Sequence, residues 1–309
     1  MVDHSFLAEK RSLSPSNFDV CVIGHVTKDI ISVGQTTTAT TPGGTAYYTS
    51  VGLTKVGLRV AVVTKVAKED EDLLLGNLKG EKIALFCQES ERSSVFENAY
   101  SAENLDTRLQ RIRSIGTPFS PEDVEAIGAT AFHVGPLTSQ DISIDLLKQL
   151  AKRPGIVSLD VQGMLRSAHV GEVREEDWLD KEAGLAYVDI LKTDEKEALI
   201  LSGQKVLDRA AAALASLGPK EVIVTMGSRG SLIYAEKTWH SVPCFFPKKV
   251  GYPTGCGDTY VAGYLYQKLK GVPPEMAGRF AAATATLKME SPGPFRGSEA
   301  DVRALLSSI

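Results

Sequence analysis

The amino-acid sequence predicts an α/β fold, a doubly wound and mainly parallel sheet with helices on both faces. Short apolar runs typical of buried strands recur along the chain, for instance at 130–134, 156–160 and 221–225. Segments of helical length separate many of these runs, and strands that alternate with helices form parallel βαβ units. A chain of 309 residues is also long enough to enclose a large core.

The first elements are expected close to the N-terminus. Residues 18–24 form an apolar run that ends in glycine, which is typical of a buried strand. Gly43 and Gly44 precede an expected helix from Thr45 to about Lys55. The later expected elements are strands at 59–66 and 130–134, a helix at 140–150, strands at 156–160 and 187–191, helices at 194–201 and 206–217, a strand at 221–225, a β-rich stretch at 231–246, and helices at about 258–269, 276–289 and 299–306.

Two separated segments, about 27–41 and 93–117, are expected to form a small accessory β sheet. Their β-prone runs mix Thr, Ser and Arg with apolar residues, so they suit partly exposed strands better than core strands. Residues 1–17 show no periodicity and are expected to be a disordered leader. The folded domain is therefore expected to span 18–309.

The composition excludes several classes of function. Lys and Arg number 34 and Asp and Glu number 38, so the formal charge of −4 supplies no overall cationic field for a nucleic acid, which is an unexpected partner. The chain has neither an apolar run of the roughly 18 residues that span a bilayer nor a signal-peptide core. A cytoplasmic protein without a membrane partner is expected. The cysteines and histidines lack metal-ligand spacing, so neither a disulfide framework nor a zinc site is indicated.

Residues 254–263, TGCGDTYVAG, are the sharpest candidate for chemistry. Gly255 and Gly257 come directly before an expected helix, where backbone N–H groups and the helix dipole make an anion pocket. Asp258 would repel a bound phosphate, but it suits a base that takes a proton from an attacking hydroxyl. In the alternative interpretation the glycines only make a turn and Asp258 only complements the helix dipole. A dinucleotide-binding G-x-G-x-x-G motif is excluded, because Tyr260 occupies the third glycine position.

Together with Gly43-Gly44, the segment Gly255-Cys-Gly-Asp258 resembles the two signatures of the ribokinase-like (PfkB) carbohydrate kinases. The resemblance covers about residues 18–309 and implies a ribokinase-like fold, in which the accessory β segments form a lid over the sugar. Further landmarks follow the family order: Gly24 with Asp29, residues 191–197, and residues 225–230. The stretches that look closest to inositol-kinase-like members are 23–29, 95–100, 160–163 with Arg166, and 289–294.

The resemblance implies phosphoryl transfer from ATP, with Asp258 as the catalytic base. The backbone N–H groups of Gly255, Cys256 and Gly257 would stabilise the charge that develops on the transferred group. The Cys256 side chain is interpreted as a small filler and not as a nucleophile.

A magnesium site is implied at an expected helix start. Asp194 and Glu197 lie three residues apart and would organise Mg²⁺ through water molecules, as the family's N-x-x-E motif does. The alternative is that both carboxylates only complement the helix dipole.

Substrate and nucleotide contacts are also implied by the resemblance. The predicted substrate-binding residues are Asp29, Gly43, Gly44, Asn98, Gln162 and Arg166. As alternatives, Asp29 is a solvated loop residue just past the first strand, the glycine pair is a plain helix cap, and Arg166 is a surface residue. The predicted nucleotide-binding residues are Thr225, Gly227 and Gly230, of which Gly230 suits a turn better.

Three residues depart from the family pattern. Tyr252 stands where many members have an aspartate associated with a monovalent cation, which puts activation by potassium in doubt. Tyr48 and Thr27 replace asparagines of the ribokinases, so a pentose such as ribose is not the expected acceptor.

The leading hypothesis is an ATP- and Mg²⁺-dependent kinase that phosphorylates a hydroxyl of a small sugar or polyol, with myo-inositol favoured. A nucleoside or phosphosugar kinase of the same family is the nearest alternative. A non-catalytic sugar-binding sensor is a further alternative, because a fold does not determine a function. Exposed edges of the accessory strands suit pairing between subunits, so a homodimer through the lid is also considered.

Overall fold

The computed structural model describes residues 17–33, 36–100, 108–249 and 251–308. The expected leader, residues 1–17, lies outside these ranges apart from Asn17. Parts of the two expected lid segments, 34–35 and 101–107, also lie outside them.

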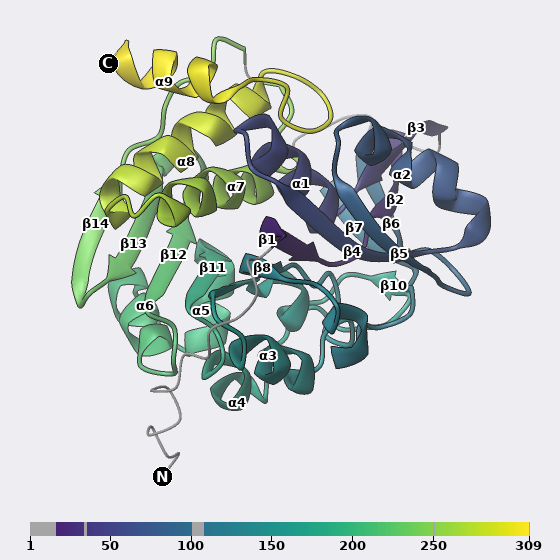
Figure 1. The fold of residues 1–309 in the computed structure, drawn as a ribbon, viewed down its shortest axis with the longest axis horizontal. Coiled ribbons are helices and arrows are strands. Elements are labelled where there is room, and N and C mark those ends of the chain that lie inside the picture. The colour runs from purple at the N-terminus through teal and green to yellow at the C-terminus, as the bar shows by residue number, and fades with distance from the viewer. Residues whose placement is uncertain (1–16, 34–35, 101–107, 250, 309) are drawn as a thin grey trace.

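A large sheet runs through the centre of the molecule (Figure 1). Its neighbouring strands from β12 to β5 are parallel, whereas β13 and β14 are antiparallel, so the expected mainly parallel sheet is confirmed. In spatial order the nine strands found in the described ranges are β14 (Thr238–Val242), β13 (Ser231–Ala235), β12 (Glu221–Thr225), β11 (Ile190–Asp194), β9 (Ile156–Asp160), β8 (Ala129–Val134), β1 (Phe18–Ile23), β4 (Val60–Val66) and β5 (Ala84–Glu89).

Helices cover both faces of this sheet (Figure 1). One face carries α1 (Thr45–Lys55), α2 (Glu71–Gly80), α7 (Cys256–Leu269), α8 (Pro274–Met289) and α9 (Glu299–Ser307). The other face carries α3 (Ile144–Ala151), α4 (Lys181–Leu185), α5 (Glu195–Ser202) and α6 (Leu207–Ala215). Each layer encloses its own apolar core, with Leu53, Tyr264 and Phe280 in the first and Phe132, Leu146 and Leu214 in the second. Two cores on opposite faces are what a doubly wound sheet requires.

A second sheet lies beside the large one and joins distant parts of the chain. Strand β2 pairs in parallel with β6, which places segments of both expected accessory regions in one sheet. Its strands, in spatial order, are β10 (Gly171–Glu172), β7 (Arg108–Ser114), β6 (Val95–Tyr100), β2 (Thr27–Val33) and β3 (Thr36–Gly43).

The expected strand at 187–191 is displaced along the chain. Strand β11 spans Ile190–Asp194, because the backbone from Gly184 to Val188 is held in turns by hydrogen bonds to residues 184 and 185. The observed strand contains Lys192, a charged residue that argues against a buried strand. Its ammonium is buried because it pairs with Asp160, with Nζ 3.0 Å from Oδ2.

Other element ends also differ from the expectation. The helix expected at 140–150 begins at Ile144, because the Ser143 side chain caps it by accepting a hydrogen bond from the Leu146 N–H. The elements between residues 67 and 92, α2 and β5, were not predicted.

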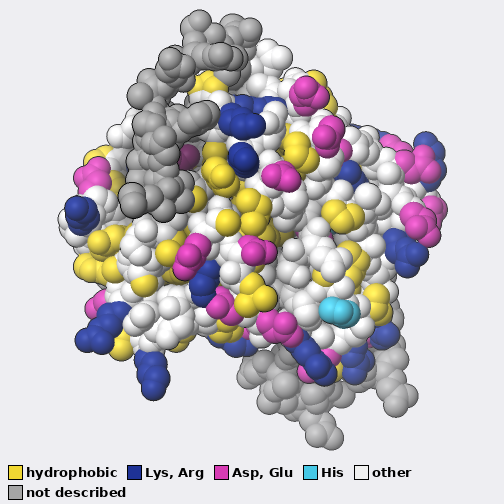
Figure 2. Space-filling model, turned by 90° about the horizontal axis from the view of Figure 1, so that it is seen from below, with side chains coloured by type: hydrophobic (Ala, Val, Ile, Leu, Met, Phe, Trp, Pro, Cys, Tyr) yellow, Lys and Arg dark blue, Asp and Glu magenta, His cyan; other side chains and the backbone are white. Residues whose placement is uncertain are grey.

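The surface carries both signs of charge. Figure 2, which views the molecule from below, shows acidic and basic side chains interspersed among apolar ones on that face. Among the residues that the structure describes, no helix combines the length and the apolar character needed to cross a membrane.

Candidate active site

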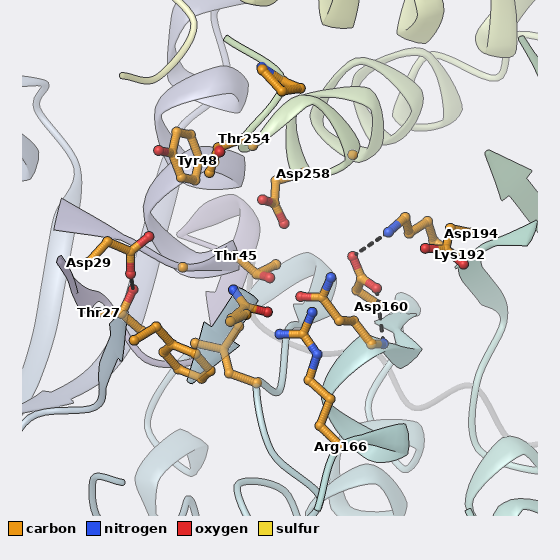
Figure 3. Close-up of a pocket in the computed structure, with 18 of the residues that line it drawn as sticks. Thr27, Asp29, Thr45, Tyr48, Asp160, Arg166, Lys192, Asp194, Thr254 and Asp258 are labelled. Carbon is orange, nitrogen blue, oxygen red and sulfur yellow. Dashed lines mark hydrogen bonds and ion pairs between the residues drawn. The ribbon is translucent and has the colours of Figure 1, made fainter. Parts of the chain in front are cut away.

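A cavity of about 540 Å³ lies at the carboxyl edge of the large sheet, next to the second sheet. Strand β2 contributes Thr27 and Asp29, and the start of α1 contributes Gly44 and Thr45. The ends of β9, β11 and β12 and the turn before α7 complete the wall (Figure 3). Ligands of doubly wound sheets bind at this edge, where the order of the strands reverses.

The glycine-rich turn leads directly into α7. Gly255 adopts a left-handed conformation with φ of 81° and stands immediately before the helix, which begins at Cys256 and not at Asp258 as expected. A Cβ atom at Gly255 would lie 2.3 Å from the Tyr48 ring, so only glycine combines this backbone angle with this contact. The turn and Tyr48 are therefore packed against each other at the cavity wall.

The structure corrects one predicted anion-binding group. The Cys256 N–H donates to the Pro253 carbonyl over 3.1 Å, so it is committed to the turn itself. The Thr259 N–H donates to Gly255, and the amide of Gly257 precedes this first helical hydrogen bond, as at any helix N-terminus. Burial raises the pKa of the Cys256 thiol to about 11, so the thiol is protonated at neutral pH.

Asp258 points from the first turn of α7 into the cavity (Figure 3). Burial raises the pKa of its carboxyl to about 6, and the nearby carboxylate of Asp160 acts in the same direction. The positive charges of Lys192 and Arg166 and a hydrogen bond with Thr45 act in the opposite direction. A carboxyl with this pKa is ionised at neutral pH and remains basic enough to accept a proton.

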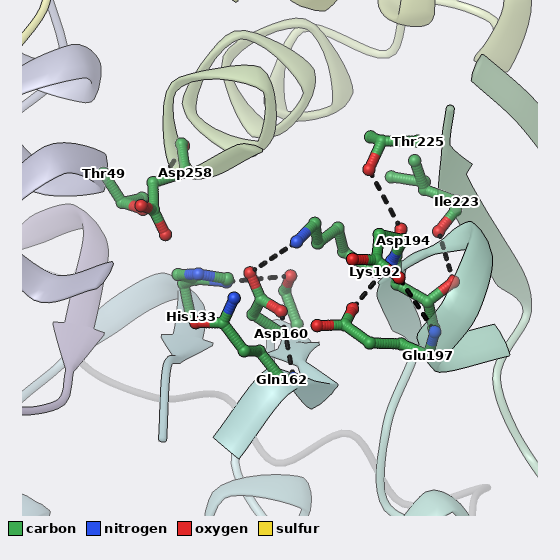
Figure 4. A network of polar contacts seen from close by, with 12 residues as sticks. Thr49, His133, Asp160, Gln162, Lys192, Asp194, Glu197, Ile223, Thr225 and Asp258 are labelled. Atoms are coloured by element: carbon green, nitrogen blue, oxygen red, sulfur yellow. Dashed lines mark hydrogen bonds and ion pairs between the residues drawn. The ribbon is translucent and has the colours of Figure 1, made fainter. Parts of the chain in front are cut away.

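A buried ion pair lies next to this carboxyl (Figure 4). Lys192 Nζ is 3.0 Å from Asp160 Oδ2, and the two side chains are 6% and 2% exposed. Burial alone would lower the pKa of Lys192, but the carboxylates of Asp160, Glu197 and Asp258 outweigh it and raise the pKa. Lys192 is also close to the turn, because a Cβ atom at Gly257 would lie 3.3 Å from its Nζ.

Sequence reasoning did not select Lys192 or Asp160 as site residues. The available signal was a lysine inside the apolar run Ile190–Thr193, since a charge in a buried strand requires a partner or a function.

Asp194 and Glu197 cap helix α5. The Asp194 N–H donates to Glu197 Oε2 over 2.7 Å, and the Glu197 N–H donates to Asp194 Oδ1 over 2.8 Å (Figure 4). The helix-end interpretation therefore accounts for one oxygen of each carboxylate. Burial raises the pKa of Glu197 to about 7. Asp194 lines the main cavity, and both residues line an adjoining cavity of about 330 Å³.

The acidic residues at the wall of the cavity fit Mg²⁺ bound through few protein ligands. Among the described residues, no group of three or more His, Cys, Asp or Glu side chains is arranged to hold a metal ion. Magnesium usually binds one or two carboxylates together with phosphate oxygens and water. The second carboxylate oxygen of Asp194, at the wall of the main cavity, suits that mode of binding.

Asp29 lies in strand β2 of the second sheet, within the accessory segment expected at about 27–41, and not in a solvated loop as in the alternative interpretation. Its Oδ1 accepts a hydrogen bond from the Thr27 hydroxyl over 2.7 Å. A Cβ atom at Gly43 would lie 2.3 Å from Asp29 Oδ2. Gly43 therefore provides the space for this carboxylate, while Gly44, with φ of 86°, starts helix α1.

Gln162 and Arg166, from the segment after β9, line both cavities. Asn98 does not line the cavity: it is buried in β6 and accepts a hydrogen bond from Gln110 Nε2 over 3.1 Å. Gln110, which was not predicted, does line the cavity.

Of the predicted nucleotide-binding residues, the structure brings only Thr225 to the wall of the cavity. Gly227 lies in the turn that follows β12. Gly230 has φ of 87°, and a Cβ atom there would lie 2.1 Å from the Val242 carbonyl oxygen. This position supports the interpretation that Gly230 serves the turn.

Residues 160–300 match the family described as pfkB family carbohydrate kinase. The chain therefore contains a PfkB family domain. This match includes the α7 turn with Asp258 and the end of β11.

The similarity to known proteins extends beyond residues 160–300. One similar solved structure is a pyrophosphate-dependent kinase in the ribokinase family, complexed with a pyrophosphate analog and myo-inositol. Its sequence is 29% identical to this chain, and its TM-score is 0.83. The match covers 92% of this chain and 99% of that chain. The cytidine kinase of Thermococcus kodakarensis is 25% identical over 273 residues, which are 86% of this chain and 94% of that protein. The inositol 3-kinase of Arabidopsis thaliana is 24% identical over 267 residues, which are 83% of this chain and 69% of that protein.

These comparisons confirm the resemblance inferred from the sequence. The fold is ribokinase-like, and residues 160–300 match a family of carbohydrate kinases, while the similar proteins named above include kinases of sugars, polyols and nucleosides.

The raised pKa of Asp258 predicts a stability effect. Because the pKa is higher in the folded state than in the unfolded chain, ionisation of Asp258 lowers stability as the pH rises from about 4 to about 6. Asp258→Asn should therefore raise the free energy of unfolding by roughly 1–3 kcal/mol at pH 7.5 and by much less at pH 4. Urea denaturation at the two pH values measures the difference.

Asp301→Asn is the matched control. Hydrogen bonds from Ser298 lower the pKa of Asp301, so this carboxylate stabilises the fold at neutral pH. Its replacement should lower the stability at pH 7.5, and the loss should shrink as the pH falls toward 3. An equal effect of Asp258→Asn at pH 7.5 and pH 4 would contradict the assigned environment of Asp258.

Proposed function

We propose that the chain is a Mg²⁺- and ATP-dependent kinase that phosphorylates a hydroxyl of a small polyol or sugar, with myo-inositol favoured. The observation that carries the proposal is the Asp258 carboxylate, which points into the cavity from the first turn of α7. A binding protein would not need a basic carboxylate beside an anion-binding helix terminus, where it opposes the binding of phosphate.

The proposed step is an in-line displacement at the γ-phosphorus. The acceptor hydroxyl gives its proton to the Asp258 carboxylate, and its oxygen forms a new bond to phosphorus. The bond from phosphorus to the bridging oxygen breaks, and ADP leaves with the electron pair. Asp258, with a pKa of about 6, is ionised at neutral pH and ready to accept the proton.

Positive groups beside Asp258 would stabilise the phosphoryl group during transfer. The Gly257 N–H at the start of α7 and the ammonium of Lys192 are both close to the turn. Such fixed charges stabilise a transition state without having to reorganise. Asp160 would hold Lys192 in place through their ion pair.

Magnesium would be held near Asp194, at the wall of the cavity. When bound, the ion neutralises charge on the donor phosphates. The Glu197 N–H would orient the Asp194 carboxylate by donating to its Oδ1, while the Glu197 carboxylate holds the Asp194 backbone N–H.

The wall of the cavity favours a hydroxyl-rich acceptor without a phosphate. Asp29, Thr27 and Gln162 offer polar groups that suit hydroxyls. Of the described lining residues only Arg166 and Lys192 are cationic, and Lys192 is already paired with Asp160. Support for myo-inositol comes from the similar solved structure that contains it, and the second sheet would be a lid over this acceptor. A nucleoside acceptor is the alternative, because Phe96 and Tyr48 also line the cavity.

Pyrophosphate is a second candidate donor, because the kinase in that similar structure is pyrophosphate-dependent. Pyrophosphate and ATP share the two phosphoryl groups next to the bond that breaks. The proposed roles of Asp258 and Lys192 are the same for both donors.

The exposed edge of β3 would suit pairing with a second copy of the chain.

A panel of donors and acceptors tests the proposed function. Purified protein is assayed with Mg·ATP or Mg·pyrophosphate against myo-inositol, fructose, ribose, cytidine, adenosine and fructose 6-phosphate. We expect turnover with ATP and myo-inositol, detected as ADP and as the phosphorylated product. A preference for cytidine would show that the acceptor is a nucleoside and not myo-inositol. If folded protein that binds a donor turns over none of these pairs, the proposed kinase activity is contradicted.

The contact between Gly43 and Asp29 yields a second test. Gly43→Ala should displace the Asp29 carboxylate and raise the KM for the acceptor roughly tenfold to a hundredfold, with little change in the KM for the donor. Gly76→Ala is the matched control, because a Cβ atom at Gly76 in helix α2 meets nothing within 4 Å. An unchanged KM for the acceptor in Gly43→Ala would contradict the proposed role of Asp29 in binding the acceptor.

A further inference from the structure

Lys288, near the end of helix α8, is buried directly behind the turn that leads into α7. Its side chain is 1% exposed, although it does not line the cavity. The ammonium donates a hydrogen bond to the Tyr252 carbonyl over 2.7 Å. It also lies 5.6 Å from the centre of the Tyr48 ring. These contacts place a positive charge beside the anion-binding turn.

This ammonium has no carboxylate within ion-pair distance among the described residues. Burial lowers its pKa, while the nearby Cys256 and Asp258 act in the opposite direction. The Cys256 thiol stays neutral at pH 7 because its own pKa is about 11. A carbonyl dipole and an aromatic face are therefore the direct partners of a buried charge, an arrangement that costs stability. A buried lysine that costs stability is expected to have a function in the site.

The contacts of Lys288 converge on the turn. The Tyr252 carbonyl accepts from Lys288, and the Tyr252 N–H donates to the Met289 carbonyl over 3.1 Å. The end of α8 therefore holds residue 252 on both sides of its backbone. The Tyr48 ring, over which Lys288 lies, occupies the space that a side chain at Gly255 would need. Lys288 thus holds Tyr252 directly and lies over the Tyr48 ring that packs against Gly255.

We propose that Lys288 is a positioning residue, a built-in cation that clamps the turn before α7 as a bound monovalent cation would. Carbonyl oxygens bind an ammonium group and a potassium ion by the same charge–dipole attraction. Because the covalently attached ammonium is always present, phosphoryl transfer needs no added monovalent cation. The inference rests on the proposed function for its kinetic test, and a second test is independent of turnover.

The kinetic test compares potassium chloride with choline chloride at equal ionic strength. Wild-type turnover should differ by less than about twofold between the two salts. Lys288→Ala opens space for an ion; its kcat/KM for the donor should fall at least roughly tenfold in choline and recover in part with potassium or methylammonium. Lys288→Met fills the space without charge and should show the loss but not the recovery.

The second test uses thermal unfolding. An ion that binds only the folded state raises the melting temperature. Potassium should therefore raise the melting temperature of Lys288→Ala more than choline does, and it should not do so for wild type. Lys65→Ala is the control for the loss of a buried lysine, since Lys65 pairs with Asp123 and does not line the cavity. It should be destabilised without any specific response to potassium.

Three results would overturn the inference. One is wild-type turnover that requires potassium. Another is an unchanged kcat/KM in Lys288→Ala, and the third is a loss in that variant with no response to potassium or methylammonium in either test. If wild type turns over no donor and acceptor at all, the proposed function fails, and the melting temperatures alone decide whether the Lys288 site holds a cation.

Discussion

The buried ion pair between Lys192 and Asp160 is the interaction on which the charge arrangement of the cavity depends. It places one ammonium among three carboxylates, those of Asp160, Glu197 and Asp258. With that ammonium present, burial still raises the pKa of Asp258 to about 6 and of Glu197 to about 7. Removal of Lys192 would leave Asp160 buried without its partner and raise both pKa values further. One lysine therefore allows a buried carboxylate to be a base at neutral pH.

Two glycines determine how the parts around that pair approach one another. At Gly43, the last residue of β3, the missing side chain leaves room for the Asp29 carboxylate of the neighbouring strand β2. At Gly255 it leaves room for the Tyr48 ring, which connects α1 to the start of α7. A larger residue at either position would separate Asp29 and Asp258, the groups proposed to bind and to activate the acceptor. Lys288 completes the arrangement by holding Tyr252 from behind.

The residues that local patterns reveal were predictable, and those that depend on distant contacts were not. Gly255, Gly257 and Asp258 precede or begin a helix, and such positions have local sequence signals. Lys192 follows the strand expected at 187–191 and was not expected to be buried. Its partner Asp160 is 32 residues away, so the ion pair cannot be predicted from a local pattern. The Cys256 N–H looked available until its contact with Pro253 was known. The parallel sheet was predicted well because buried strands are apolar throughout.

The central claim is that Asp258 is the base of a phosphoryl transfer, and the turnover of Asp258→Asn tests it most directly. Asparagine keeps the shape of the site but cannot take up the proton. At pH 7.5, with the donor and acceptor that wild type uses, kcat should fall by roughly 10²- to 10⁴-fold while calorimetry still detects binding of the acceptor. A variant that keeps the turnover of wild type would contradict the account.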